Sequence, residues 1–136
     1  MNLTEALYDR QTGDATLAGL LATYRGEPAV FTTDPAPGDA ELPYIVTAGS
    51  VAEEPFDTKT SRGRVITRDV RCYAAASGSA RTVRQIAERV RALLHRRTLE
   101  ISGFAWLMAE CSGPMAADEQ DAYGRIVTVR MTVEEI

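Results

Sequence analysis

The sequence has 136 residues, of which 45% are hydrophobic, 25% charged and 7% aromatic. These proportions are typical of one globular domain, and they exclude disordered and fibrous chains. No apolar run approaches the roughly 20 residues of a membrane-spanning helix, and the first residues lack the basic and apolar segments of a signal peptide. We therefore expect a single domain over residues 1–136 that lies in the cytoplasm, or in a particle assembled there, and does not bind a membrane.

The formal net charge of −4 is distributed unevenly along the chain. Residues 1–60 carry ten acids and three bases, a net charge of −7. Residues 61–97 carry ten bases and two acids, a net of +8, and residues 98–136 carry seven acids and two bases, a net of −5. Opposite charges on one chain favour association between copies, for example head to tail in a ring. Neutralisation within a single fold is the alternative.

Two short helices are predicted at the start of the chain, separated by Gly13. Asp14 is a favourable N-cap for the second helix, because its carboxylate can accept a hydrogen bond from an amide of the first turn. Gly26 marks the predicted end of that helix, since glycine is frequent just past a helix C-terminus. Residues 34–39 are rich in Pro, Asp and Gly and are predicted to form a surface loop.

Strands are predicted where apolar residues cluster or alternate with polar ones. These segments are residues 29–32, 44–51, 64–75, 104–109 and 127–134. In the last strand Val127, Val129, Met131 and Val133 are predicted to point inward. The strand over 104–109 is apolar on both faces, so we expect it to be buried on both faces or to lie at a subunit contact.

Residues 53–63 are polar apart from Phe56 and predict a loop longer than a tight hairpin turn needs. We interpret this loop as a mobile arm that contacts a partner, with a plain surface linker as the alternative. Residues 113–124 are predicted to form a second loop.

The clearest element is a helix after residue 80 that ends near Arg96. Its apolar residues fall within about 120° of a helical wheel; they are Val83, Ile86, Ala87, Val90, Leu93 and Leu94. Arg81, Arg84, Glu88, Arg91 and His95 occupy the opposite arc. We expect this helix to lie on a sheet and to show a basic face outward. The order of elements predicts an α+β fold with an antiparallel or mixed sheet of about four strands and two main helices packed on one face.

The sequence holds no motif of a hydrolase, a nucleotide-binding loop or a metalloenzyme. A single histidine, His95, is interpreted as a solvated residue near a helix C-terminus. Cys72 and Cys111 are predicted to be buried free thiols, with a disulfide between them as the alternative. We therefore predict no enzymatic activity, no cofactor and no metal site. The acidic overall charge also disfavours sequence-specific binding of nucleic acid.

A series of landmarks runs through nearly the whole chain in a fixed order. They are Gly13-Asp14-Ala15-Thr16-Leu17 with Leu20-Leu21, Leu42-Pro43-Tyr44-Ile45-Val46, the strand over 64–75 with Tyr73 near its end, the helix over 83–94, Tyr123, and the final Val/Thr strand. In this order and spacing the chain resembles the small tail-completion, or tail-terminator, proteins of long-tailed phages and phage-like gene transfer particles. Arg71 and the large number of arginines in the helix depart from the usual pattern.

The resemblance implies a tail-terminator-like domain and a structural role at the tail–neck junction of a virion or phage-like particle. It implies a ring, a homo-hexamer, that caps the tail tube and ends its elongation. The partners implied are the tail tube protein on one side and the head–tail connector or stopper protein on the other. DNA would pass through the lumen of the ring without sequence-specific binding.

Two sets of contact residues are expected on this basis. Candidates for the subunit interface are the basic residues Arg81, Arg84 and Arg91 and, on a neighbouring copy, the acids Asp118, Glu119 and Asp121. Candidates for contact with the tube or the lumen lie in the loop over 56–62; they are Phe56, Lys59 and Arg62. Two other functions stay open at this point: a head-side neck protein such as a stopper or adaptor, and a small ferredoxin-like ligand-binding or regulatory domain.

Overall fold

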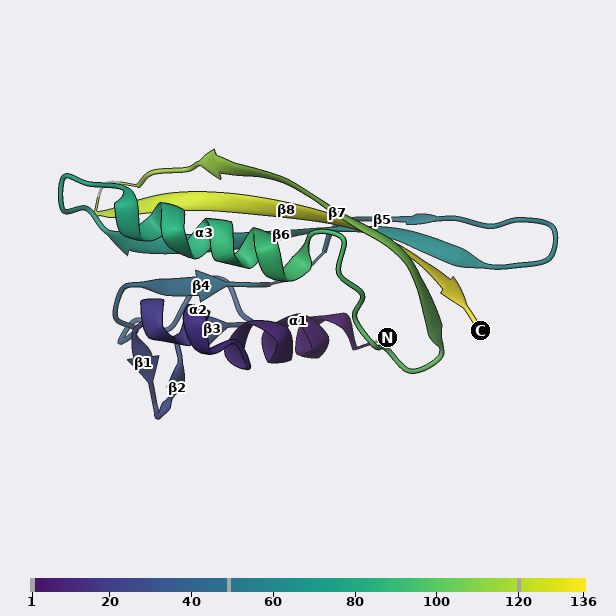
Figure 1. The fold of residues 1–136 in the computed structure, drawn as a ribbon, viewed down its shortest axis with the longest axis horizontal. Helices are drawn as coiled ribbons and strands as arrows, with labels where there is room; N and C mark the ends of the chain where they lie inside the picture. The colour runs from purple at the N-terminus through teal and green to yellow at the C-terminus, as the bar shows by residue number, and fades with distance from the viewer. Residues whose placement is uncertain (1, 49, 120) are drawn as a thin grey trace.

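The computed structural model describes residues 2–48, 50–119 and 121–136 (Figure 1). Its helices are α1 (Leu3–Thr12), α2 (Ala15–Leu20) and α3 (Arg81–Leu94). Its strands are β1 (Thr23–Tyr24), β2 (Glu27–Pro28), β3 (Val30–Phe31), β4 (Tyr44–Val46), β5 (Ser50–Pro55), β6 (Gly63–Ala75), β7 (Phe104–Ala116) and β8 (Ala122–Glu135).

One mixed sheet dominates the structure, and this confirms the predicted α+β class. The strand order is β3-β4-β6-β8-β7, and β5 also pairs with β6, so that the sheet has six strands rather than about four. The difference arises because the strand predicted over 44–51 is two strands. β4 pairs with β6 at Arg71 to Tyr73, and β5 pairs with it from Arg64 to Arg68, so the two strands lie end to end along one edge of the long β6.

The core lies between the sheet and the helices. Along β8 the side chains of Val127, Val129, Met131 and Val133 are buried, as the alternating sequence predicts. The apolar stripe of α3 packs on this side, against β6, β7 and β8, with α1 and α2 alongside (Figure 1). The other side of β6 carries polar, half-buried residues such as Thr67, Asp69 and Arg71. The helices therefore cover one face of the sheet.

The second helix is shorter than predicted. It begins at the predicted N-cap, where Asp14 accepts a hydrogen bond of 2.9 Å from the amide of Leu17, but it ends at Leu20. Gly26 is not a helix terminus. Arg25 and Gly26, with φ of 50° and 85°, form the turn that joins β1 to β2. Two positive φ angles in a two-residue turn suit the twist of an antiparallel hairpin, and glycine adopts one of them without strain.

Two predicted loops are partly strand. β5 continues to Pro55, so the segment over 53–63 is the end of an ordered hairpin. β7 continues to Ala116, well into the loop predicted over 113–124. Gly113 and Pro114, at the start of that predicted loop, lie in a β-bulge between Ser112 and Met115, where the strand accommodates residues that cannot keep the regular pairing.

Candidate assembly surfaces

The outward face of α3 is basic, as predicted. Arg81 and Arg84 are exposed and Arg91 is half-buried, and none of the three forms an ion pair with any described residue. Arg89 of the same helix differs, because its Nε and Nη2 donate to the two carboxylate oxygens of Asp14 at 2.8 and 2.7 Å. The fold thus uses Arg89 to join α3 to the start of α2 and leaves the other three arginines available for contacts outside the chain.

The acidic turn between β7 and β8 contains the other half of the predicted interface. Asp118 is engaged within the subunit, since it accepts hydrogen bonds from Arg125 Nη1 at 2.9 Å and from the Gly124 amide at 3.1 Å. Glu119 and Asp121 are exposed and form no ion pair with the part of the chain that the structure describes. The turn therefore offers two acids, rather than three, for contacts outside the subunit.

The two charged surfaces lie toward the same end of the molecule. Figure 1 shows the start of α3 and the connection from β7 to β8 together at the left. No ion pair joins Arg81, Arg84 or Arg91 to the acidic turn within the described chain.

The hairpin of β5 and β6 projects beyond the helices at the opposite end (Figure 1). We call residues 51–62 the arm. Phe56, Lys59 and Arg62 are exposed in it, and every residue from 51 to 60 is exposed. Its tip is ordered by local hydrogen bonds: Thr58 N donates to Ser61 O at 2.9 Å, and Ser61 N donates to Thr58 Oγ1 at 3.0 Å. The arm is thus an ordered projection, which corrects the prediction of a long loop.

Gly63 fixes the place where the arm leaves the sheet. A Cβ atom at this position would lie 2.5 Å from Val133 O and 2.9 Å from Phe56 O. Any larger residue would therefore push β5 or β8 away from β6. The Arg62 carbonyl also accepts a hydrogen bond of 2.7 Å from the Glu135 amide, which holds the base of the arm against the end of β8.

The edge strand β7 is a further candidate contact surface. Its apolar composition predicted either burial on both faces or a subunit contact. Among the described strands it pairs with β8 alone, apart from an isolated bridge between Phe104 and Ile101, and Leu107 and Met108 are each 50% exposed and Met115 61%. The sequence predicted either complete burial or a subunit contact here, and the structure excludes complete burial. A long apolar edge strand is a site where another chain can add.

Part of this edge is already covered by the segment after α3. Arg96 N donates to Ala109 O at 2.8 Å, and Cys111 N donates to His95 Nδ1 at 3.0 Å. His95 is therefore half-buried and binds the sheet edge, which corrects its interpretation as a solvated residue. The signal was not visible in the sequence, because Cys111 lies 16 residues further along the chain.

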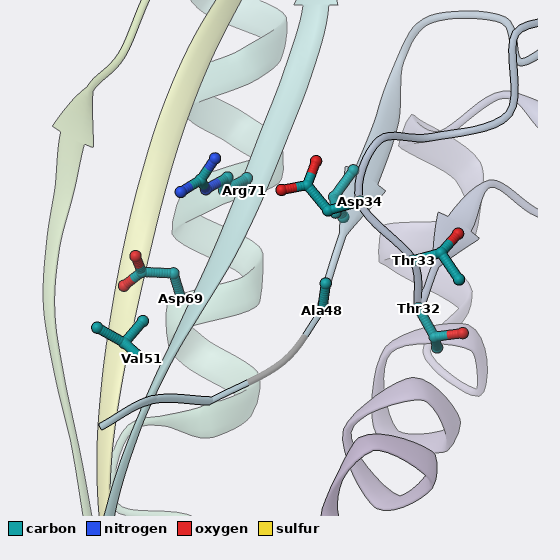
Figure 2. A pocket seen from close by; sticks show the side chains of 8 residues that line it. Thr32, Thr33, Asp34, Ala48, Val51, Asp69 and Arg71 are labelled. Carbon is teal, nitrogen blue, oxygen red and sulfur yellow. The ribbon is translucent and has the colours of Figure 1, made fainter. Parts of the chain in front are cut away.

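A depression of about 540 Å³ lies where β4 and β5 separate on the sheet face that the helices leave uncovered. Figure 2 shows Asp69 and Arg71 of β6 on one side of it and Asp34, from the loop after β3, on the other. Asp69 accepts a hydrogen bond of 2.7 Å from Thr128 Oγ1. These side chains do not form a nucleophile–base pair, and the depression is open, so its geometry supports no specific reaction.

The two cysteine thiols lie in the interior of the fold. Cys72 and Cys111 are buried and not bonded to each other, as predicted. Burial raises the pKa of the Cys72 thiol to about 12 and that of Cys111 to about 11, because desolvation disfavours the thiolate.

Within residues 2–48, 50–119 and 121–136 no three metal-ligating side chains come together. Among these residues, none of the helices has the length and apolar composition that crossing a membrane requires.

Comparison with known proteins gives two findings. Residues 5–134 match the family described as "Tail completion protein gp17". The fold is similar to that of a chain in a structure described as "Virion of native gene transfer agent (GTA) particle", with a TM-score of 0.80, 23% sequence identity and coverage of 97% of this chain and 94% of that one. No curated protein matches the sequence. Because the family match spans almost every residue, the chain belongs to the tail completion protein gp17 family and is a structural protein of a phage-type tail.

Proposed function

We propose that copies of this chain form a ring, a homo-hexamer, that caps the tail tube, stops its elongation and presents its other face to the head-side connector or stopper. Membership of the tail completion family over residues 5–134 is the observation that carries this proposal. The similar fold found in a gene transfer agent virion supports a place at the tail–neck junction of a phage or phage-like particle. In this role the chain is not an enzyme, and DNA passes through the lumen without sequence-specific contacts.

The contact between copies joins the basic face of α3 to the acidic turn of the neighbour. Arg84 and Arg91 are turned away from the core and are unpaired among the described residues, whereas Arg89 is held by Asp14. Guanidinium groups bind carboxylates through two parallel hydrogen bonds, and Glu119 and Asp121 are the acids that the turn leaves exposed. Two different, complementary surfaces on each copy make a head-to-tail contact that can close into a ring.

The arm contacts the tail tube or the lumen. It projects from the end of the subunit opposite the charged surfaces (Figure 1), so it stays accessible when α3 and the acidic turn are covered. Phe56 provides an exposed apolar anchor, and Lys59 and Arg62 provide positive charge next to it. Aromatic residues and arginine are enriched at the anchor positions of protein interfaces, which favours Phe56 and Arg62 over Lys59 as the anchors.

Charge reversal tests the subunit contact. The double variant Arg84→Glu, Arg91→Glu is expected to abolish formation of the ring and to leave the monomer folded, because both side chains point away from the core. Sedimentation velocity measures the assembly and circular dichroism measures the fold. Adding Glu119→Arg and Asp121→Arg to the double variant is expected to restore the ring through the inverted pairs.

A matched control changes the net charge by the same amount elsewhere. Arg25 and Arg97 are also exposed, and the variant Arg25→Glu, Arg97→Glu is expected to assemble like the natural chain. Normal assembly of the Arg84, Arg91 variant, or an equal loss in the control, rejects the proposed contact.

A further inference from the structure

Two tyrosines lie together at one end of the sheet face that the helices leave uncovered. Tyr44 begins β4, Tyr73 lies near the end of β6, and the two residues are paired in the sheet. Their ring centroids are 5.5 Å apart, the ring planes are tilted by 56°, and both side chains are half-buried. Figure 1 shows the start of β4 and the end of β6 at the left, where the connection from β7 to β8 also lies.

These two rings belong to a longer aromatic row. Tyr24 of β1 contacts Phe31 of β3 with 5.1 Å between ring centroids, and Phe31 contacts Tyr44 at 5.6 Å. The guanidinium carbon of Arg25 lies 5.2 Å from the centroid of the Tyr24 ring. A cation over an aromatic ring is attracted by the negative face of the ring. The outer end of the row therefore already holds one guanidinium.

Gly124 allows the acidic turn to cross the uncovered face next to Tyr73. Gly124 pairs with Tyr73 in the sheet, and a Cβ atom on this glycine would lie 3.2 Å from Cε1 of the tyrosine ring and would collide with Ala117 O. The chain that leaves β7 thus passes directly over Gly124, where Ala117 N donates to Gly124 O at 3.0 Å. Glu119 N then donates to Ala122 O at 2.8 Å. This path brings Glu119 to the two tyrosines.

Glu119 gives this end of the sheet face a negative charge. It is exposed and forms no ion pair with a described residue. Burial is the main cause that raises the pKa of Tyr44 and Tyr73, and the charge of Glu119 acts in the same direction on both. Arg71, two residues before Tyr73, opposes this effect at Tyr73. Among the described residues, however, no cation lies over either of the two rings.

A carboxylate beside two aromatic rings suits a guanidinium group. The edge of the guanidinium donates hydrogen bonds to the carboxylate, and its plane stacks on an aromatic face. A lysine ammonium can pair with the acid, but it lacks the planar group that stacks. Such a site therefore favours arginine over lysine.

We propose that Tyr44, Tyr73 and Glu119, which we call the aromatic–acidic site, receive an arginine of α3 from a neighbouring copy. This inference rests on the proposed subunit contact and adds that the guanidinium stacks on tyrosine as well as pairing with an acid. Charge complementarity identifies the occupant, because Arg84 and Arg91 of α3 are unpaired among the described residues. The contact between copies then depends on the shape of the basic group and not on its charge alone.

A double-mutant cycle tests the stacking. Arg84→Lys, Arg91→Lys keeps both charges and removes both guanidinium planes. In the natural chain this change is expected to lower the association constant of the copies by about 5- to 30-fold. In the Tyr44→Leu, Tyr73→Leu background the same change is expected to alter it by less than about twofold, because the rings are already gone. Sedimentation equilibrium measures association, and circular dichroism confirms that each variant is folded.

Tyr24→Leu is the matched control, because it removes a ring of the same row that Arg25 already covers. In this background the lysine change is expected to cost as much as in the natural chain. An equal cost in the Tyr44→Leu, Tyr73→Leu background, or no cost in the natural chain, overturns the inference and leaves the charge contact in place. Normal assembly of Arg84→Glu, Arg91→Glu rejects the proposed contact itself, and the inference with it.

A second measurement needs neither the ring nor the leucine variants. N-acetyl-arginine amide is added to the Arg84→Glu, Arg91→Glu variant, whose copies cannot fill the aromatic–acidic site with these two side chains. In spectra of the five tyrosine rings, the signals that Tyr44→Phe and Tyr73→Phe remove are expected to shift, and the other three to stay in place. N-acetyl-lysine amide at the same concentration and ionic strength is expected to cause a smaller shift. Equal shifts with the two probes, or no shift with arginine, overturn the inference.

Discussion

At the scale of single residues, Asp14 shows how one side chain supports two elements. It caps α2 through the amide of Leu17 and binds Arg89 of α3 through both carboxylate oxygens. The hydrogen bond from Arg89 is the largest cause of the lowered pKa of Asp14, and the bond from Leu17 and the charge of Arg89 act in the same direction against partial desolvation. Asp14 therefore stabilises the packing of the N-terminal helices on α3 in its ionised form.

Two substitutions of Asp14 distinguish the contribution of the helix cap to stability from that of the ion pair with Arg89. Asp14→Ala is expected to lower the free energy of unfolding by about 1–2 kcal/mol at pH 7, since it removes both. Asp14→Asn keeps a good N-cap and is expected to lose less than about 1 kcal/mol, the part due to the charge. Urea denaturation measures both changes. Asp9→Ala is the control, because Asp9 is exposed on α1, and it should change stability by less than about 0.5 kcal/mol.

The pH dependence of these variants follows from the lowered pKa. A carboxyl whose pKa is lower in the folded chain than in the unfolded one stabilises the fold above the unfolded pKa, here the ordinary value of 3.8. That contribution is lost as the pH falls through the folded pKa. The difference between the natural chain and Asp14→Asn is therefore expected to be constant from pH 7 to pH 5 and to shrink below pH 4. A difference that grows on acidification contradicts the assignment.

The sequence predicts residue roles that depend on near neighbours and misses those that depend on distant ones. The cap at Asp14 was predictable because its partner Leu17 lies in the next turn. The pairing with Arg89 spans 75 residues, so nothing in the sequence around Arg89 indicated its partner. Arg68 is a different case, because the alternation of β6 places it on the same buried face as Ile66 and Val70, a signal that the sequence analysis did not use.

At the scale of elements, regular periodicity over a long segment made prediction reliable. The apolar stripe of α3 and the alternation of β8 are long enough to identify both the kind of secondary structure and the face that is buried. Elements of two or three residues, such as β1 and β2, carry too few positions to show a period. Loops were predicted over residues 53–63 and 113–124, but β5 and β7 run into these segments. Both strands lie at a sheet edge, where the missing amides of Pro55 and Pro114 cost little.

The arm gives a prediction at this scale. Deleting residues 57–61 and closing the hairpin with an Asn-Gly turn is expected to change the free energy of unfolding by less than about 1 kcal/mol, because the residues removed are exposed or half-buried and touch no core. The same deletion is expected to reduce capping of tails in a producer strain. Urea denaturation and electron microscopy of the particles measure the two effects.

As a control for the arm, Lys59→Ala leaves the hairpin intact and removes one charge only. It should impair capping less than the deletion does. If particles with the deletion have normal, joined tails, the arm is not a contact with the tube or the lumen. If the deletion unfolds the chain, the tip contributes to folding in a way that its exposure does not explain.

At the scale of the whole molecule, the structure separates the surfaces for which we propose contacts. The arm lies at one end, and the basic face of α3 begins at the other end beside the acidic turn (Figure 1). The order of landmarks along the chain predicted the family correctly because it samples the whole sequence, whereas the proposed contact surfaces depend on how three helices and eight strands of the described chain are arranged in space. An assembly of identical copies needs such separated surfaces, so that contacts around a ring do not block contacts along the tail.

The most direct test of the ring as a tail terminator is electron microscopy of particles from a producer strain that lacks the gene for this chain. The account predicts tails that exceed the normal length and are detached from filled heads, because nothing stops growth of the tube or joins it to the connector. Free tails of normal length beside leaking heads contradict it and place the chain on the head side of the joint. Intact particles contradict any role of the chain in assembly.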